Sequence, residues 1–275
     1  MSIRFSDISF SYEGEARLLE HLNFAIEPGE FIGVVGPNGS GKTTLARLFN
    51  GGLKPSSGTI TIDDYLTTDP EYELDIKRKV AIITQEPEDQ IIAPTVWDEV
   101  SFGLEVQGLS PSEIRHRCES ILISCRLEAF REIHPLLLST GEQIRVLLAA
   151  ALARQPRYLV LDEVYSALDG ASRQNITSLI DELRSEWGLG IILLTHRLEE
   201  LSLADRILVL SDGHIVMNDK PLEIFIHAQS EVSWQLEPPL LYQVYHFLRP
   251  ETRIKFTELN SILGDMLGPL NGLPS

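Results

Sequence analysis

Short apolar runs alternate with longer amphipathic segments along most of the chain. Five runs have the length and residue types of strands buried on both faces, and they lie at residues 31–35, 80–84, 158–161, 190–194 and 207–210. Helical segments fall between these runs, at residues 45–50, 139–153 and 170–186. The alternation predicts an α/β fold in which helices cover both faces of one sheet.

The N-terminal part of the chain has a different pattern. Apolar and polar positions alternate over residues 2–10 with an irregularity near Asp7, which predicts a strand with a bulge. Shorter strands are expected at residues 22–26, 59–62 and, after the turn signal Asp212-Gly213, at 215–217. Residues 63–79 are predicted to form an irregular, mostly acidic loop.

Two more helices are predicted, at residues 95–106 and 111–129. The second contains Cys118 and Cys125, which match no metal-binding spacing, so we expect both to be reduced and buried.

The pattern changes again after residue 221. Pro238-Pro239 breaks the chain, and short amphipathic helices are expected at residues 240–248 and 256–267. We therefore expect a main domain over residues 1–230 and a small helical domain over residues 231–275.

The charge of the chain narrows the choice of partners. The formal net charge is −17, which opposes nonspecific binding to nucleic acid, so no nucleic-acid partner is expected. The first residues lack the apolar core of a signal peptide, and no uncharged apolar run approaches the roughly 20 residues that span a bilayer. We expect a soluble chain whose membrane role, if it has one, comes through a partner.

The stretch after the first buried run fits the phosphate-binding pattern G-x-x-x-x-G-K-[ST], and strand, glycine-rich loop and helix follow one another as that pattern requires. The loop backbone and the start of the helix offer N–H groups to phosphate oxygens. Lys42 would reach the β- and γ-phosphates of ATP, and the Thr43 hydroxyl would bind Mg²⁺. The candidate nucleotide-binding residues are Gly36, Pro37, Asn38, Gly39, Ser40, Gly41, Lys42, Thr43 and Thr44.

Polar residues follow three of the other buried runs. They are Gln85, the pair Asp162-Glu163, and His196. Ligands of open α/β sheets bind beyond the carboxyl ends of the strands, so these side chains should converge on the nucleotide. Each residue alone could equally be a helix cap or a structural histidine.

Their chemistry suits ATP hydrolysis. Asp162 and Gln85 could bind Mg²⁺, and Gln85 could also contact the attacking water. Glu163 could activate that water as a general base. His196 could hydrogen-bond the γ-phosphate.

These motifs, in this order, resemble those of ABC transporter ATPases over residues 1–220. Residues 36–44 match Walker A, residues 159–163 match Walker B, and residues 138–142 resemble the LSGGQ signature. The resemblance implies a P-loop NTPase fold with a RecA-like core, an antiparallel β subdomain and a helical subdomain at about residues 95–155. It also implies contacts with ATP from Tyr12, Ser139, Gly141 and Asp169, the last three across a dimer interface.

A narrower resemblance is to the ATPases of energy-coupling factor (ECF) transporters, the cobalt-type importers of vitamins and metal ions. It is carried by residues 85–96 and 98–103 and by the helical C-terminal region. It implies a second ATPase subunit, an integral-membrane scaffold gripped through arginine-bearing helices, a substrate-binding component, and a place on the cytoplasmic face of the membrane. The acidic residues Glu86, Glu88 and Asp89 suit such a scaffold.

Two positions depart from the family pattern. Thr140 replaces the first signature glycine, and it would be strained only if its φ were positive. Val164 stands where proline usually follows the Walker B glutamate. Two other functions stay open: a soluble ABC ATPase without a transport role, and a regulatory subunit that binds nucleotide with weak turnover. The sequence does not name the cargo, nor does it distinguish a homodimer from a heterodimer.

Overall fold

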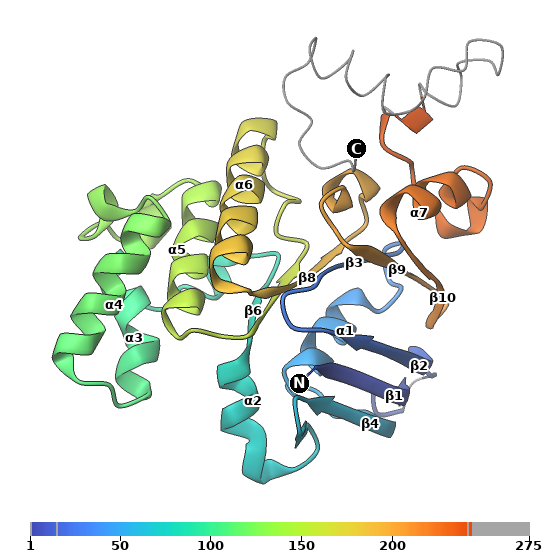
Figure 1. Ribbon diagram of the computed structural model, residues 1–275, viewed down its shortest axis with the longest axis horizontal. Coiled ribbons are helices and arrows are strands. Elements are labelled where there is room, and N and C mark those ends of the chain that lie inside the picture. The colour runs from blue at the N-terminus through green and yellow to red at the C-terminus, as the bar shows by residue number, and fades with distance from the viewer. Residues whose placement is uncertain (1, 15, 241, 244–275) are drawn as a thin grey trace.

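The computed structural model describes residues 2–14, 16–240 and 242–243, and within these ranges it contains two sheets (Figure 1). The first is a four-stranded antiparallel sheet with the order β2-β1-β4-β5. Its strands are β1 (Ile3–Phe10), β2 (Leu19–Ile26), β4 (Ser57–Ile62) and β5 (Tyr65–Leu66). The predicted bulge in the first strand is confirmed, because Asp7 has a φ of 53° and the pairing with β2 shifts between Phe5 and Ile8.

The second sheet has six strands in the order β10-β9-β3-β8-β7-β6. All neighbouring pairs are parallel except β10 with β9, which form the predicted hairpin. The strands are β3 (Phe31–Val35), β6 (Val80–Ile83), β7 (Tyr158–Asp162), β8 (Gly190–Thr195), β9 (Arg206–Ser211) and β10 (His214–Asp219).

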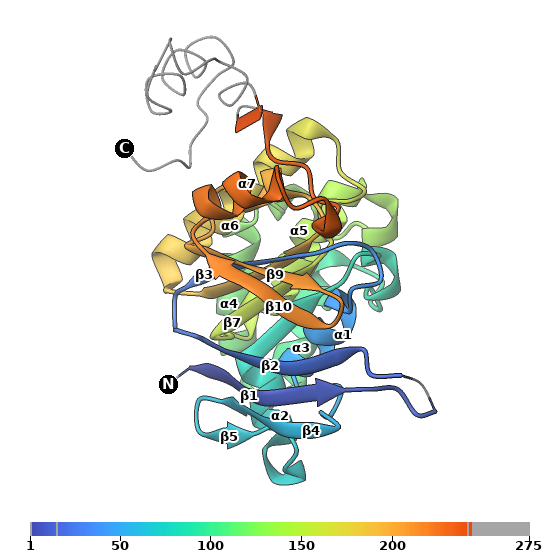
Figure 2. The same cartoon turned by 90° about the vertical axis from the view of Figure 1, so that its right-hand side faces the viewer.

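Successive residues of the central strands enter two different hydrophobic cores, because side chains alternate across a strand. Ile192 and Leu194 of β8 pack toward α1 and the antiparallel sheet. Ile191 and Leu193 pack toward α5 and α6 on the opposite face. Both faces are covered, as predicted, and Figure 2 shows the antiparallel sheet as a separate layer below the mixed one.

The helices connect and cover these strands. They are α1 (Lys42–Phe49), α2 (Glu73–Lys79), α3 (Val96–Val106), α4 (Pro111–Ser124), α5 (Thr140–Ala153), α6 (Gly170–Trp187) and α7 (Pro221–Ala228). Short 3₁₀ helices are η1 (Pro70–Tyr72), η2 (Pro87–Asp89), η3 (Glu128–Phe130), η4 (Pro135–Leu137), η5 (Leu198–Leu201) and η6 (Val232–Trp234). Helices α3, α4 and α5 pack together beside the mixed sheet.

Two predictions about helices were wrong. Residues 63–79 do not form an irregular loop, because they contain β5, η1 and α2. Among the residues of α2 only Ile76 is buried, so the helix shows no apolar stripe in the sequence. The helix predicted at residues 111–129 ends earlier, at Ser124, because Arg126 two residues later has a left-handed φ of 58°.

Cys118 and Cys125 are free and buried, as predicted.

The described C-terminal residues pack against the main domain. Trp234, Leu236 and Tyr242 belong to the same hydrophobic core as α6 and α7. The domain boundary near residue 230 stays a prediction, and the helices expected at 240–248 and 256–267 fall almost wholly outside the described residues. Within the described part, no helix combines the length and apolar character that would let it cross a membrane.

Candidate functional site

The loop between β3 and α1 is built around its glycines. A side chain at Gly36 would collide with the backbone oxygen of Leu210, so no larger residue fits there. Gly41 precedes α1 with a φ of 100°, a conformation that other residues rarely adopt. The loop therefore curls tightly and delivers Lys42 and Thr43 at the start of the helix.

Lys42 is turned into the loop. Its Nζ donates to the carbonyl oxygens of Gly36 at 2.9 Å and Pro37 at 3.1 Å, and lies 3.3 Å from Oε1 of Glu163. The side chain is only 6% exposed. The ammonium group is thus held by oxygen atoms at the position where phosphate oxygens would replace some of them.

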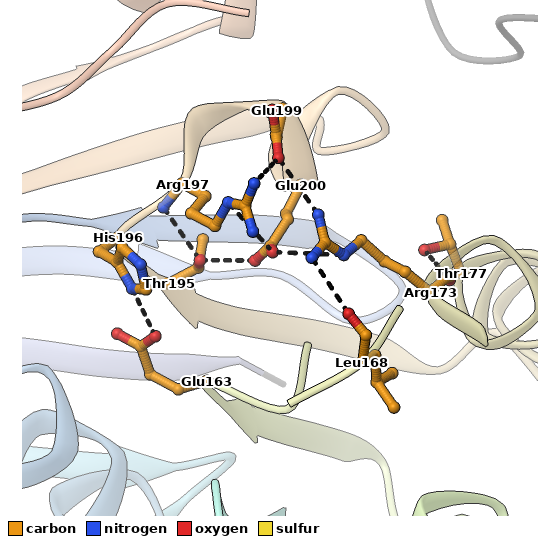
Figure 3. A network of polar contacts seen from close by, with 9 residues as sticks. All are labelled: Glu163, Leu168, Arg173, Thr177, Thr195, His196, Arg197, Glu199 and Glu200. Atoms are coloured by element: carbon orange, nitrogen blue, oxygen red, sulfur yellow. Dashed lines mark hydrogen bonds and ion pairs between the residues drawn. The ribbon is translucent and has the colours of Figure 1, made fainter. Parts of the chain in front are cut away.

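Glu163 has a strained backbone. Its φ of 54° is left-handed, which is uncommon for a residue with a side chain and costs about 1–3 kcal/mol. Its N–H donates to the Leu194 carbonyl at 2.9 Å, and its Oε2 lies 2.7 Å from Nδ1 of His196 (Figure 3). The backbone turn at the end of β7 aims the carboxylate at both Lys42 and His196.

Asp162 is a buried carboxylate next to the loop. It is 2% exposed, and its Oδ1 has no hydrogen-bond partner. Burial raises the pKa of this carboxyl group, and a hydrogen bond from Thr43 opposes that shift. A buried carboxylate oxygen without a partner beside a threonine hydroxyl fits a site for a hard cation such as Mg²⁺.

A cavity of about 470 Å³ is lined by Lys42, Thr43, Glu163 and His196, whereas Asp162 is not among its lining residues, and its volume is in the range of ligand sites. Exposed Gln85 reaches it from the end of β6. Leu18 and Ser166 also line the cavity, and the sequence analysis did not predict a contact with the nucleotide for either of them. The cavity is lined by Leu18, Asn38, Gly39, Gly41, Lys42, Thr43, Thr44, Gln85, Glu163, Ser166 and His196.

Tyr12 lies at the edge of this region. Its hydroxyl is 3.1 Å from Oγ1 of Thr44, and its ring meets the Phe10 ring edge-on at 4.9 Å. The residue is 38% exposed, and a partly exposed aromatic ring of this kind can stack on a planar group.

Ser139, Gly141 and Asp169 are not brought to this cavity. Ser139 and Gly141 line another, of about 300 Å³, which shares no residue with the first. Asp169 caps α6 through the Ser172 N–H at 2.7 Å, and this bond lowers the pKa of its carboxyl group. The phosphate loop and the signature residues Ser139 and Gly141 therefore line two separate cavities of one chain.

The signature helix is not strained by its unusual sequence. Thr140 is the first residue of α5 and does not have a positive φ. The Ser139 N–H donates to Oε2 of Glu142 at 2.9 Å in a capping box, and the Ser139 hydroxyl donates to the same oxygen at 2.7 Å. The pKa of Glu142 is lowered mainly by its hydrogen bonds from Ser139.

Comparison with known proteins identifies the family. The family model described as "ABC transporter" matches residues 19–166. The EcfA1 ATP-binding protein of an energy-coupling factor transporter from Caldanaerobacter subterraneus subsp. tengcongensis is 38% identical, and the match covers 90% of this chain and 91% of that protein. The chain belongs to the energy-coupling factor family of ABC transporter ATP-binding proteins.

Solved structures agree with this assignment. CbiO1 of Clostridium perfringens, described as part of the ABC transporter complex CbiONQ, aligns with a TM-score of 0.78 at 30% identity over 90% of this chain and 95% of that one. The dimeric structure of MJ0796, a bacterial ABC transporter cassette, aligns with a TM-score of 0.71 at 30% identity. The alignment covers 80% of this chain and 98% of that one. The fold is that of an ABC ATPase, and the activity is ATP hydrolysis coupled to transport.

Proposed function

We propose that the 470 Å³ cavity binds ATP together with Mg²⁺, with Lys42 and the loop N–H groups on the phosphates and Tyr12 against the base. Thr43, Asp162 and Gln85 would hold the metal ion, which supplies charge neutralisation on the phosphate oxygens. Lys42 would exchange its contacts with Glu163 and the loop carbonyls for phosphate oxygens. This exchange frees the carboxylate of Glu163 as ATP binds.

Glu163 and His196 would then act as the catalytic pair. The single observation that carries this proposal is the position of the Glu163 carboxylate, 3.3 Å from Lys42 and 2.7 Å from His196 at the cavity wall. Glu163 would accept a proton from the attacking water, and His196 would hold the γ-phosphate in line. Gln85 would orient the water from the end of β6.

Each nucleotide would be enclosed by two subunits. Ser139 and Gly141 line a second cavity, and Asp169 lines neither cavity, so within one chain all three leave the phosphate cavity open. In a head-to-tail dimer, the signature helix of one subunit would present its N–H groups and the Ser139 hydroxyl to the γ-phosphate bound by the other. ATP would hold such a dimer closed, and hydrolysis would release it.

The dimer would drive an importer of vitamins or transition-metal ions. Its partners would be a second ATPase subunit, an integral-membrane scaffold and a substrate-binding component, with the chain held at the cytoplasmic face of the membrane. Residues 231–275 would contribute to the dimer contact. The relatives' energy-coupling role and the membership of CbiO1 in CbiONQ support this assignment.

The test is phosphate release from purified protein, with and without the membrane partner. Glu163→Gln should reduce turnover at least about 100-fold while ATP still binds, because only the proton acceptor is lost. An unchanged rate in Glu163→Gln would show that the assigned role is wrong.

A further inference from the structure

A buried polar network lies directly behind the proposed catalytic pair (Figure 3). At its centre is Glu200 of η5, whose side chain is 3% exposed. Its Oε2 accepts a 2.6 Å hydrogen bond from the Thr195 hydroxyl, and Thr195 Oγ1 in turn accepts the Arg197 N–H at 3.1 Å. Because His196 lies between Thr195 and Arg197, one hydroxyl held by Glu200 fixes its backbone on both sides.

Arg173 of α6 connects this network to the loop that carries Asp169. Its guanidinium donates to Glu199 at 3.2 Å and to the carbonyl oxygen of Leu168 at 3.4 Å. The neighbouring residue Ser172 lines the signature cavity. A single side chain thus contacts the segment after His196 and the residue before Asp169.

The contact between Arg173 and Glu200 is incomplete. Nε of Arg173 and Oε1 of Glu200 are 3.8 Å apart, and both atoms are buried without a hydrogen bond. A relative shift of about 0.8 Å would bring them to hydrogen-bond distance. Buried ion pairs with unmade hydrogen bonds are poor sources of stability, so the arrangement calls for another explanation.

We propose that Arg173 and Glu200 are positioning residues for ATP hydrolysis. Glu200 fixes, through Thr195, the backbone that presents His196 to Glu163. Arg173, which lies beside Glu200 and donates to Glu199, links this backbone to the Asp169 loop through the Leu168 carbonyl. The inference rests on the proposed function, because it takes Glu163 and His196 as the catalytic pair. Neither Arg173 nor Glu200 touches the cavity that would hold the nucleotide.

The test compares four substitutions with a matched control. Arg173→Met, Glu200→Gln and Thr195→Val should lower kcat about tenfold or more and leave the KM for ATP within about twofold, because the reacting groups are displaced while the nucleotide contacts are intact. Thr195→Ser keeps the hydroxyl and should restore a near wild-type kcat. A purely structural role for the hydroxyl would not separate kcat from KM in this way.

Arg184→Met is the control. Arg184 lies on the same helix with nearly the same exposure, 21% against 22% for Arg173, and it donates to Gly29 and pairs with Asp205 at 2.6 Å. Arg184→Met should lower the melting temperature as Arg173→Met does, but it should leave kcat unchanged. Equal kcat values for Arg173→Met and Arg184→Met, or for Thr195→Val and Thr195→Ser, would overturn the proposal.

Glu163→Gln, measured in the same series, separates this inference from the function on which it rests. If Glu163→Gln retains wild-type turnover, the catalytic pair is wrong. If Glu163→Gln loses turnover while Glu200→Gln and Arg173→Met keep it, only the positioning inference is wrong. Should Arg173→Met fail to fold, Glu200→Gln and the two Thr195 variants still decide whether the network positions His196, and an unchanged kcat in all three would overturn the proposal.

Discussion

Replacing Asp162 by asparagine separates the binding of metal from the folding of the site. Asp162 is 2% exposed, has an oxygen atom without a partner, and has its pKa raised by burial. Its folded-state pKa therefore lies above the unfolded value, so the ionised form opposes folding at neutral pH. Asp162→Asn removes the charge at almost constant volume, and we expect the nucleotide-free variant to be at least as stable as the wild type.

Bound Mg-ATP should stabilise the wild type more than it stabilises Asp162→Asn. At a concentration of 100 times its Kd, Mg-ATP stabilises the wild type by about 2.7 kcal/mol. One kcal/mol corresponds to about 2–4 °C in Tm for chains somewhat shorter than this one, so the expected rise is roughly 5–10 °C. Asp162→Asn lacks the charged oxygen that would face the metal. Its Tm should rise only as much as that of the wild type does with ATP and EDTA.

The assay is thermal unfolding with ATP and either Mg²⁺ or EDTA, and Asp63→Asn is the matched control. Asp63 is also a buried carboxylate, 4% exposed, but it pairs with Lys79 at 2.7 Å and Arg157 at 3.5 Å. Asp63→Asn should lower the free energy of unfolding by about 3 kcal/mol, and its Tm should still rise further with ATP and Mg²⁺ than with ATP and EDTA, as in the wild type. If the Tm of Asp162→Asn shows the same additional rise with Mg²⁺, Asp162 does not bind the metal ion.

Other side chains give independent tests. Tyr12→Ala should raise the KM for ATP about tenfold, because stacking on the ring is lost. Tyr12→Phe loses only the contact with Thr44 and should raise the KM by about threefold or less. Equal KM values for the two variants would exclude stacking. Ser139→Ala and Ser110→Ala each remove a capping-box hydroxyl and should each cost about 1 kcal/mol in unfolding experiments, but only Ser139→Ala should slow phosphate release. Because the pKa of Glu142 is lowered, its stabilisation is present above the ordinary carboxyl pKa and is lost as the pH falls through the lowered value. Acid-unfolding curves of Glu142→Gln should lack that component, and an unchanged curve would contradict the assignment.

Several residues that line the 470 Å³ cavity were predictable because the sheet topology places them. Parallel strands end at one edge of a sheet, so polar residues after β6, β7 and β8 had to lie near the loop after β3. Gln85, Glu163 and His196 do line one cavity with Lys42. The left-handed φ of Glu163 was not predictable, because no glycine marks it.

Other features depend on packing that the sequence does not display. Helix α2 buries only Ile76, so its sequence lacks an apolar stripe, and only its acidic first turn and basic last turn indicate a helix. The contact between Arg173 and Glu200 joins α6 to η5, and no pattern relates residues that far apart. Ser139 and Gly141 follow a recognisable motif, but only the structure shows that the cavity they line is separate from the one that Lys42 lines.

Light scattering on Glu163→Gln with saturating ATP and Mg²⁺ tests the two-subunit site most directly. The measurement is made on this chain alone and with the ATPase subunit that co-purifies with it. The account predicts that nucleotide shifts the mass from the 30.8 kDa monomer to a dimer, and that EDTA reverses the shift. A mass that stays at the monomer value in both samples, with ATP shown to be bound, would contradict it.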